Sequence, residues 1–229
     1  MLAKLKLIKT PKGIDSVLML SAILIIWIGN YSNIDLAIAD SMFDRVHMQF
    51  SGAPSLNHGI VQVVLALFAA TVIFFAIWDA ARPLAWLAPC RTAVRVLALS
   101  ALVVPATLQF LSFFSGVIGP ADLLRYGGQL PYTRLLETAP ASVTAMASLP
   151  ATQAPHAWWL LALAVFWLPR RPRVAALVGS VMLLAGLAAG WSQQWQGAQF
   201  FSHTLWSAWI ATFLVYLLYG CCKADHALA

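Results

Sequence analysis

The chain has 229 residues, of which 61% are hydrophobic and only 10% are charged, and its mean hydropathy is +0.80. Because a soluble domain carries about 25% charged residues, this composition excludes an ordinary soluble globular protein. The net charge of +6 comes mostly from basic residues that flank apolar runs. That distribution is a membrane-topology signal, and it argues against a nucleic-acid partner.

The apolar runs predict an all-α, polytopic membrane protein with six transmembrane helices in a single domain over residues 1–229. In chain order the predicted spans are about 16–31, 59–78, 93–114, 156–168, 174–191 and 203–219, and the predicted outer loops are 32–58, 115–155 and 192–202. Eleven of the fourteen basic residues then fall on the side opposite these loops. The positive-inside rule therefore predicts that both termini are cytoplasmic.

Within the first outer loop, the segment 33–50 alternates apolar and acidic residues at helical spacing. This pattern predicts an amphipathic helix that lies on the outer membrane surface. Its apolar face would contain Ile34, Leu36, Ile38, Met42 and Phe43, and the acidic side chains of Asp35, Asp40 and Asp44 would lie outside that face.

The other two outer loops contain the most distinctive text, GPADLLRYGGQLPY at 119–132 and GAQFFSHTLWSAW at 197–209. With the start of the fourth span, these loops would meet at one membrane face. In order and in wording the chain resembles the type 2 phosphatidic acid phosphatase (PAP2) superfamily, in its bacterial membrane lipid-phosphatase branch. The signature of that family is K-x6-R-P, then P-S-G-H, then S-R-x5-H-x3-D.

The chain keeps the spacing of the signature positions, but other residue types replace most of the catalytic residues of the family. In the third motif Ser192 is retained, and Gln193, Gln199 and His203 replace the arginine, the histidine and the aspartate. The second motif falls on residues 150–153, where Pro150 is retained and Gln153 replaces the histidine. In the first motif Ser112 replaces the lysine, Gly119 replaces the arginine, and Pro120 is retained.

The resemblance implies a phosphohistidine mechanism, in which the nucleophile of the family would stand at Gln199. A glutamine amide cannot act as that nucleophile, and the cationic residues that would hold the phosphoryl oxygens are absent. We therefore expect a catalytically degenerate lipid-phosphatase homologue, a pseudoenzyme that binds a lipid or isoprenoid headgroup at its outer face.

Two alternatives stay open. One is an active phosphatase or phosphotransferase that acts on phosphatidate, lipid A or undecaprenyl pyrophosphate, with His203 and His156, each one helical turn from its family position, as the catalysts. The other is a small transporter, although buried acidic residues of the kind that mark ion pathways are scarce in the spans.

The remaining polar residues of the motif segments, Asp122, Arg125, Tyr126 and Trp195, are candidates for a pocket beside the motifs, and Asp122 and Arg125 have the spacing of a local ion pair. We expect no cofactor and no metal site, since the histidines lack metal-ligand spacing. The expected partner is a membrane lipid, with a lipid phosphate or isoprenoid headgroup as a candidate ligand. The expected location is a bacterial inner membrane, with the motif face toward the periplasm.

Overall fold

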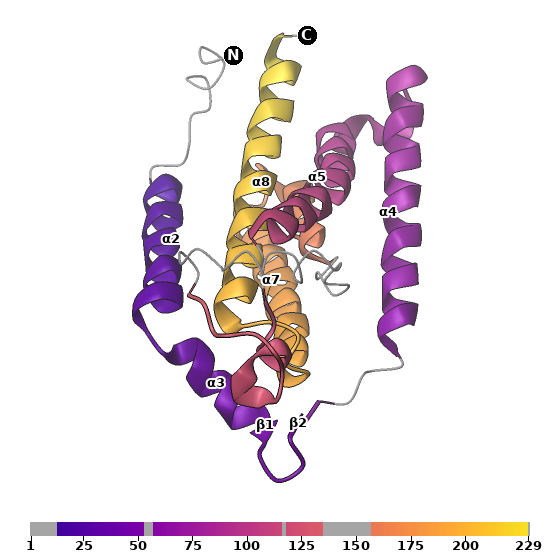
Figure 1. Cartoon of the computed structure of the whole chain (residues 1–229). Helices are drawn as coiled ribbons and strands as arrows, with labels where there is room; N and C mark the ends of the chain where they lie inside the picture. The colour runs from indigo at the N-terminus through magenta and orange to yellow at the C-terminus, as the bar shows by residue number, and fades with distance from the viewer. Residues whose placement is uncertain (1–12, 53–56, 116–117, 135–156, 229) are drawn as a thin grey trace.

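The computed structural model describes residues 13–52, 57–115, 118–134 and 157–228 of the chain. Most of these residues are helical (Figure 1). In chain order the elements are α2 (Ile14–Tyr31), α3 (Ile34–Met42), β1 (Phe43–Asp44), β2 (Gln49–Phe50), α4 (Asn57–Ala81), η1 (Ala85–Cys90), α5 (Arg91–Ser115), η2 (Pro120–Asp122), η3 (Leu124–Tyr126), η4 (Trp158–Trp167), α7 (Pro172–Trp195) and α8 (Phe201–Leu228). The α-helical class and the multi-pass membrane character expected from the sequence are confirmed at this level.

The long helices run back and forth between two ends of the molecule (Figure 1). We call the end with α3 and the β1–β2 hairpin the hairpin end, and the opposite end, where α2 begins and α8 finishes, the C-terminal end. Helix α2 packs beside α8, and α5, α7 and α8 surround the short helix η4. The chain therefore brings its first and last long helices together.

Within the described part of the chain, five helical segments are long and apolar enough to cross a membrane: 14–31, 59–81, 85–112, 172–195 and 201–223. Five of the six predicted spans are found in these segments. The predicted span 156–168 corresponds to η4, a 3₁₀ helix of 10 residues. At a rise of about 2 Å per residue it is about 20 Å long, short of a hydrocarbon core of about 30 Å. Six spans, and the cytoplasmic side of the termini, stay predictions.

The main core is built around η4. Trp158 and Ala162 of this helix are almost completely buried, and they belong to one apolar cluster with Val96 of α5 and Ala211 of α8. Gly186 of α7 makes room for the indole, since a Cβ at that position would stand 2.4 Å from Cζ3 of Trp158. A short helix at the centre of the bundle is thus fixed by close packing on three sides.

The predicted amphipathic helix 33–50 is wrong in its extent and in the face it buries. Helix α3 ends at Met42 and is followed by the β1–β2 hairpin, in which Phe43 pairs with Phe50. The buried residues of α3 are Asp35, Ala39 and Met42, at i, i+4 and i+7 on one helical face, while Ile34 is exposed. The reason is tertiary, because Asp35 finds its hydrogen-bond partners on α8.

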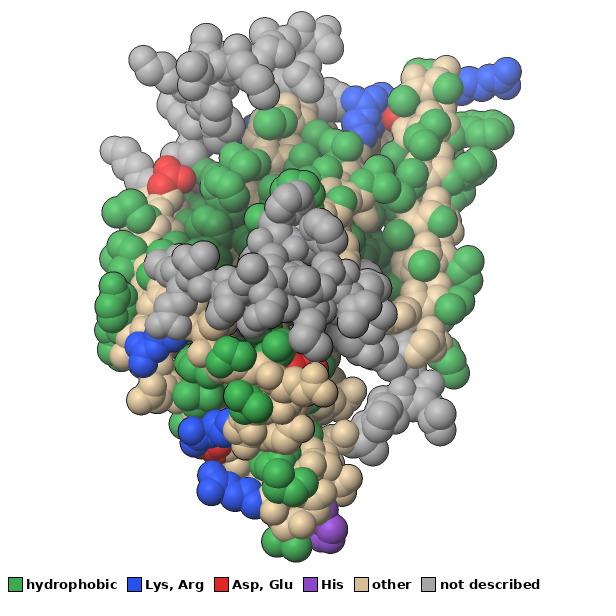
Figure 2. Space-filling view, viewed as in Figure 1, with side chains coloured by type: hydrophobic (Ala, Val, Ile, Leu, Met, Phe, Trp, Pro, Cys, Tyr) green, Lys and Arg blue, Asp and Glu red, His purple; other side chains and the backbone are tan. Residues whose placement is uncertain are grey.

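Helix α4 stands at the edge of the bundle and packs mainly against α5 (Figure 1). None of its most apolar 18-residue window is buried within the protein, and Figure 2 shows hydrophobic side chains along its length. At the C-terminal end α4 is fastened by Asp79, whose carboxylate accepts hydrogen bonds from Arg91 Nε at 2.6 Å and Arg91 Nη2 at 3.0 Å. Lipid tails are the natural covering of so apolar a surface.

Candidate functional site

The segments that carry the first and third motifs lie against each other at the hairpin end. The backbone N–H of Ala121 donates to the carbonyl oxygen of Gly197 at 2.9 Å. A Cβ on Gly119 would stand 2.7 Å from the carbonyl oxygen of Ala198, so glycine permits this approach. Pro120, between them, is buried. Two stretches about 80 residues apart thus form one surface, and the segment of the second motif lies outside the described residues.

The third segment has its shape because α7 ends in a Schellman motif. Gly197 has a φ of +71°, Ala198 N–H donates to the carbonyl of Gln193 at 2.9 Å, and Gly197 N–H donates to the carbonyl of Gln194 at 2.9 Å. Because α7 continues to Trp195, the predicted outer loop 192–202 is wrong at its start: Gln193 is helical. The connection between α7 and α8 is reduced to residues 196–200.

The side chains that follow this turn form a neutral polar cluster between α7 and α8. Thr204 Oγ1 accepts hydrogen bonds from Gln194 Nε2 and from Gln199 Nε2, each at 3.1 Å. Gly190 leaves space for Thr204, since a Cβ there would stand 2.2 Å from Thr204 Cγ2. Gln199 is therefore held by a hydroxyl group where the family would have its nucleophile.

A buried carboxyl group joins this cluster from α3. Asp35 is 4% exposed, and its Oδ1 accepts the backbone N–H of Ser202 at 2.8 Å while its Oδ2 accepts the Ser202 hydroxyl at 2.5 Å. Ser202 is the second residue of α8, so Asp35 caps the N-terminus of that helix from a distant part of the chain. Negative charge is favoured at a helix N-terminus, where the backbone N–H groups lack partners.

Several buried polar atoms of the cluster have no hydrogen-bond partner within the part of the chain that the structure describes. No described residue supplies a hydrogen bond to Gln193 Oε1, Gln194 Oε1 or His203 Nδ1. The His203 ring is half-buried and packs edge-to-face on Phe200, with ring centroids 5.7 Å apart. Gln193 and His203 are two of the positions where the motif comparison expects catalytic residues, and here they are a buried amide and a packed imidazole.

A second polar group, beside the cluster, fastens α3 to the first motif segment. Arg125 donates to Asp40 from Nε at 2.9 Å and from Nη2 at 2.6 Å, and Tyr126 Oη donates to Asp40 at 3.0 Å. Arg125 pairs with Asp40 and not with Asp122, so the local ion pair expected from the spacing of Asp122 and Arg125 is wrong. In its place, the Asp40 carboxylate on α3 accepts hydrogen bonds from both Arg125 and Tyr126.

The charges and hydrogen bonds of this group shift the pKa values of Asp40 and Tyr126. The hydrogen bonds from Arg125 hold the pKa of Asp40 below its usual range. Burial, and then the neighbouring Asp40 carboxylate, raise the pKa of Tyr126 to about 12. Tyr126 is 5% exposed and packs against the rings of both Phe43 and Phe50, so its neutral phenol is part of the aromatic packing at the hairpin end.

Tyr126 should make the protein sensitive to alkali. The pKa of Tyr126 is about 12 in the folded protein and 10.0 in the unfolded chain. The neutral phenol therefore stabilises the folded state fully below pH 10, and this stabilisation is lost as the pH rises through about 12. Two pKa units correspond to about 2–3 kcal/mol. In detergent unfolding measured between pH 8 and pH 12, Tyr126→Phe should lose less stability over pH 10–12 than the native chain. Identical slopes would contradict this account.

The other candidate residues are placed as follows. Ser112 is half-buried on α5, Ser192 is exposed and donates to the carbonyl of Ala189 at 2.8 Å, and Asp122 and Trp195 are exposed. Pro150, Gln153 and His156 lie outside the described residues. Of the four pocket candidates, Arg125 and Tyr126 face Asp40, and the structure gives Asp122 and Trp195 no part in that group.

Sequence reasoning missed three residues that the structure puts at the centre of the cluster: Asp35, Gln194 and Thr204. Gln194 and Thr204 each directly follow a motif position, Gln193 and His203, so the motif spacing passes beside them. Asp35 left no local signal, because its partner Ser202 is 167 residues away. In the described part of the chain, no three His, Cys, Asp or Glu side chains gather as metal ligands would.

Comparison with known proteins returns no relative. No protein-family model, no curated protein and no solved structure matches this chain.

Proposed function

We propose that this chain is a non-catalytic multi-pass membrane protein of PAP2-like architecture that binds the polar headgroup of a membrane lipid at its hairpin end. The proposal places the protein in a bacterial inner membrane with the hairpin end toward the periplasm. The observation that carries it is a pair of buried acceptor atoms to which no described residue donates a hydrogen bond, the amide oxygens of Gln193 and Gln194. Buried polar atoms are nearly always hydrogen-bonded, so these atoms require a donor from outside the described chain.

The chemistry of the cluster argues against phosphoryl transfer. Phosphoryl transfer needs cations to balance the charge that spreads over the phosphoryl oxygens. The hydrogen-bonded side-chain groups that the structure describes here are two amides, two hydroxyls and a carboxyl group, those of Gln194, Gln199, Thr204, Ser202 and Asp35. A carboxylate repels a phosphate, and amide oxygens accept hydrogen bonds. The cluster therefore favours the donor part of a headgroup, a hydroxyl or an ammonium group, over its phosphate.

His203 as a relocated nucleophile has little support from its surroundings. Its Nδ1 atom is buried, and its ring is fixed against Phe200. A nucleophile must reach the phosphorus atom within about 3–3.5 Å in a fixed orientation. The alternative of an active phosphatase is tested by measuring phosphate release, as described next.

The test combines turnover with binding, using the purified full chain in detergent. Phosphate release from phosphatidate, undecaprenyl pyrophosphate and lipid A should stay at the level of a buffer control. Native mass spectrometry should show retention of phosphatidylethanolamine or phosphatidylglycerol, whose headgroups carry donors, over phosphatidate. Gln193→Leu should weaken that retention about 3- to 10-fold, the value of one hydrogen bond, without lowering the melting temperature.

Gln129→Leu is the matched control, because Gln129 is exposed in the first motif segment, outside the cluster. It should leave retention unchanged. Phosphate release by the native chain that disappears in His203→Ala would overturn the proposal and establish His203 as a catalyst. Equal retention of all lipids, unaffected by Gln193→Leu, would reject the headgroup site while leaving the absence of turnover intact.

A further inference from the structure

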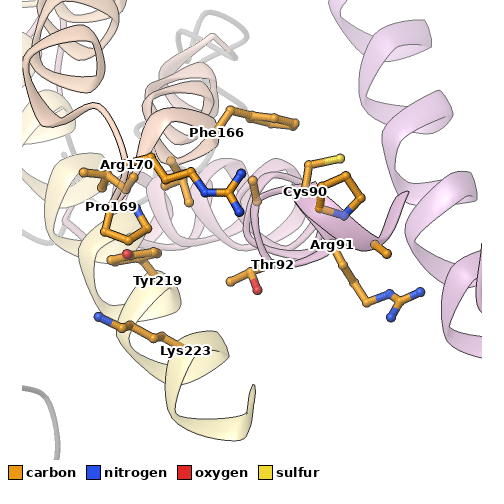
Figure 3. A pocket seen from close by; sticks show the side chains of 13 residues that line it. Cys90, Arg91, Thr92, Phe166, Pro169, Arg170, Tyr219 and Lys223 are labelled. Carbon is orange, nitrogen blue, oxygen red and sulfur yellow. The ribbon is translucent and has the colours of Figure 1, made fainter. Parts of the chain in front are cut away.

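A cavity of about 230 Å³ lies at the C-terminal end of the bundle, away from the motif segments (Figure 3). It is formed where three parts of the chain meet: the start of α5, the turn between η4 and α7, and the last turns of α8. Lys223 is 20 positions beyond His203 on α8, which corresponds to about 30 Å along the helix axis. The cavity and the polar cluster are thus separated by about the thickness of a hydrocarbon core.

The cavity has an uncompensated positive charge. Three basic residues line it, but Arg91 is paired with Asp79 and points away from Arg170 (Figure 3). Arg170 and Lys223 are exposed, and no carboxylate among the described residues lies within ion-pair distance of either. None of the described lining residues is acidic. Arg170 and Lys223 thus border one cavity as two cations without a carboxylate partner among the described residues, and in Figure 3 the Lys223 ammonium group points away from Arg170. An anion that enters between them would be attracted by both side chains.

The remaining lining is divided between polar and apolar groups. Thr92 and Tyr219 carry hydroxyl groups that can donate to an anion's oxygens, and the ring of Tyr219 lies between Pro169 and Lys223 in Figure 3. Val165 and Phe166 supply an apolar wall. A soluble anion has no use for such a wall, whereas the glycerol and the first acyl carbons of a lipid do. Cavities that bury whole drug-sized ligands are larger, about 300–1,000 Å³, so a headgroup fits this one better than an entire lipid.

We infer that this cavity binds the phosphate group of an anionic phospholipid, with Arg170 and Lys223 as its charged ligands and Thr92 and Tyr219 as hydroxyl donors. Basic pockets between membrane helices are known sites for anionic headgroups. The inference concerns the opposite membrane face from the proposed headgroup cluster, and it stands whether or not that proposal holds. It assigns to the basic residues of this end a specific ligand in addition to their effect on topology.

The test compares two pairs of substitutions in the full chain. Arg170→Gln with Lys223→Gln removes the two cavity cations, and Arg171→Gln with Arg173→Gln removes two cations that lie in or beside the same turn but do not line the cavity. Each protein is equilibrated with an equimolar mixture of phosphatidylglycerol and phosphatidylcholine, and bound lipid is counted by native mass spectrometry. The cavity pair should lose preference for phosphatidylglycerol about tenfold, and the control pair less than about twofold.

Equal losses in the two pairs, or none in the cavity pair, would overturn the inference, because the preference would then reflect general surface charge. Arg170→Lys with Lys223→Arg keeps both charges and should keep the preference, which separates charge from damage to the fold. Glycerol 1-phosphate supplies the soluble arm. If glycerol 1-phosphate binds the native chain more tightly than phosphatidylglycerol does, the phosphate site stands but its lipid source is rejected; tighter binding of phosphatidylglycerol supports the lipid.

Discussion

Asp35→Ala should destabilise the protein by about 2–4 kcal/mol, because it removes the cap of α8, which consists of two hydrogen bonds from Ser202 to the buried Asp35 carboxyl group. The Ser202 N–H and hydroxyl would be left without their acceptor in a place where Ser202 is 1% exposed. Water cannot easily replace the carboxyl group there. The expected result is a lower midpoint in thermal or detergent-induced unfolding, with the same helix content at low temperature.

Two further variants sharpen this prediction. Ser202→Ala removes the 2.5 Å hydroxyl contact but keeps the backbone contact, so a double-mutant cycle with Asp35→Ala should give a coupling of at least 0.5 kcal/mol. Asp122→Ala, which removes an exposed carboxylate at the same end, should change stability by less than about 0.5 kcal/mol. If Asp35→Ala were as mild as Asp122→Ala, the buried carboxyl group would have no structural role.

Gly197→Ala is the second substitution with a large expected effect, about 2–4 kcal/mol. Alanine in the left-handed region costs about 1–2 kcal/mol, and Gly197 has a φ of +71°. The new Cβ would also stand 2.4 Å from Cδ2 of Phe50. That ring cannot withdraw without disturbing its contacts with Phe43 and Tyr126, whose centroids lie 5.1 and 5.3 Å away. Overpacking of this kind adds about 1–3 kcal/mol.

The same change should loosen the surface that joins the two motif segments, because the carbonyl of Gly197 accepts from Ala121 N–H. Hydrogen exchange at Ala121 and at Gly52, which donates to the carbonyl of Trp195, should therefore speed up together. Gly59→Ala in α4 is the matched control, since nothing lies within 4 Å of a Cβ there. Its stability should stay within about 1 kcal/mol of the native value. If hydrogen exchange at Ala121 and Gly52 is unchanged in Gly197→Ala, the Schellman turn at the end of α7 does not hold the two motif segments together.

Hydropathy predicted the long helices well because the bilayer thickness imposes one length on every span. It is least informative at η4, a helix of only ten residues of which five, Trp158, Trp159, Leu161, Ala162 and Val165, are buried by protein. It also ended α7 too early, because Gln193 and Gln194 are polar and read as loop. In the structure these amides are buried at the end of the helix, next to α8.

The candidate site could be predicted only at the level of whole segments, where a continuous motif marks which parts of the chain meet. The text around Gly119 and Gly197 correctly indicated that two segments meet. The partners of charged residues could not be read in this way. Arg125 has an acidic neighbour three residues back, and yet it binds Asp40, 85 residues away. Local spacing favours the near partner, and only the packing of α3 beside residues 123–130 decides for the distant one.

The pairing of α2 with α8 fixes an order of events during synthesis. Trp209 Nε1 donates to the carbonyl of Leu18 across 191 residues, and Ser202 donates to Asp35 across 167. At about 5–20 residues per second, a ribosome needs about 10–40 s to produce the second partner after the first. Through that interval the α8 partner of α2 does not yet exist, and a nascent chain released before residue 202 leaves α2 without this neighbour. A quality-control protease that recognises an unpaired first helix would thus distinguish finished from truncated chains.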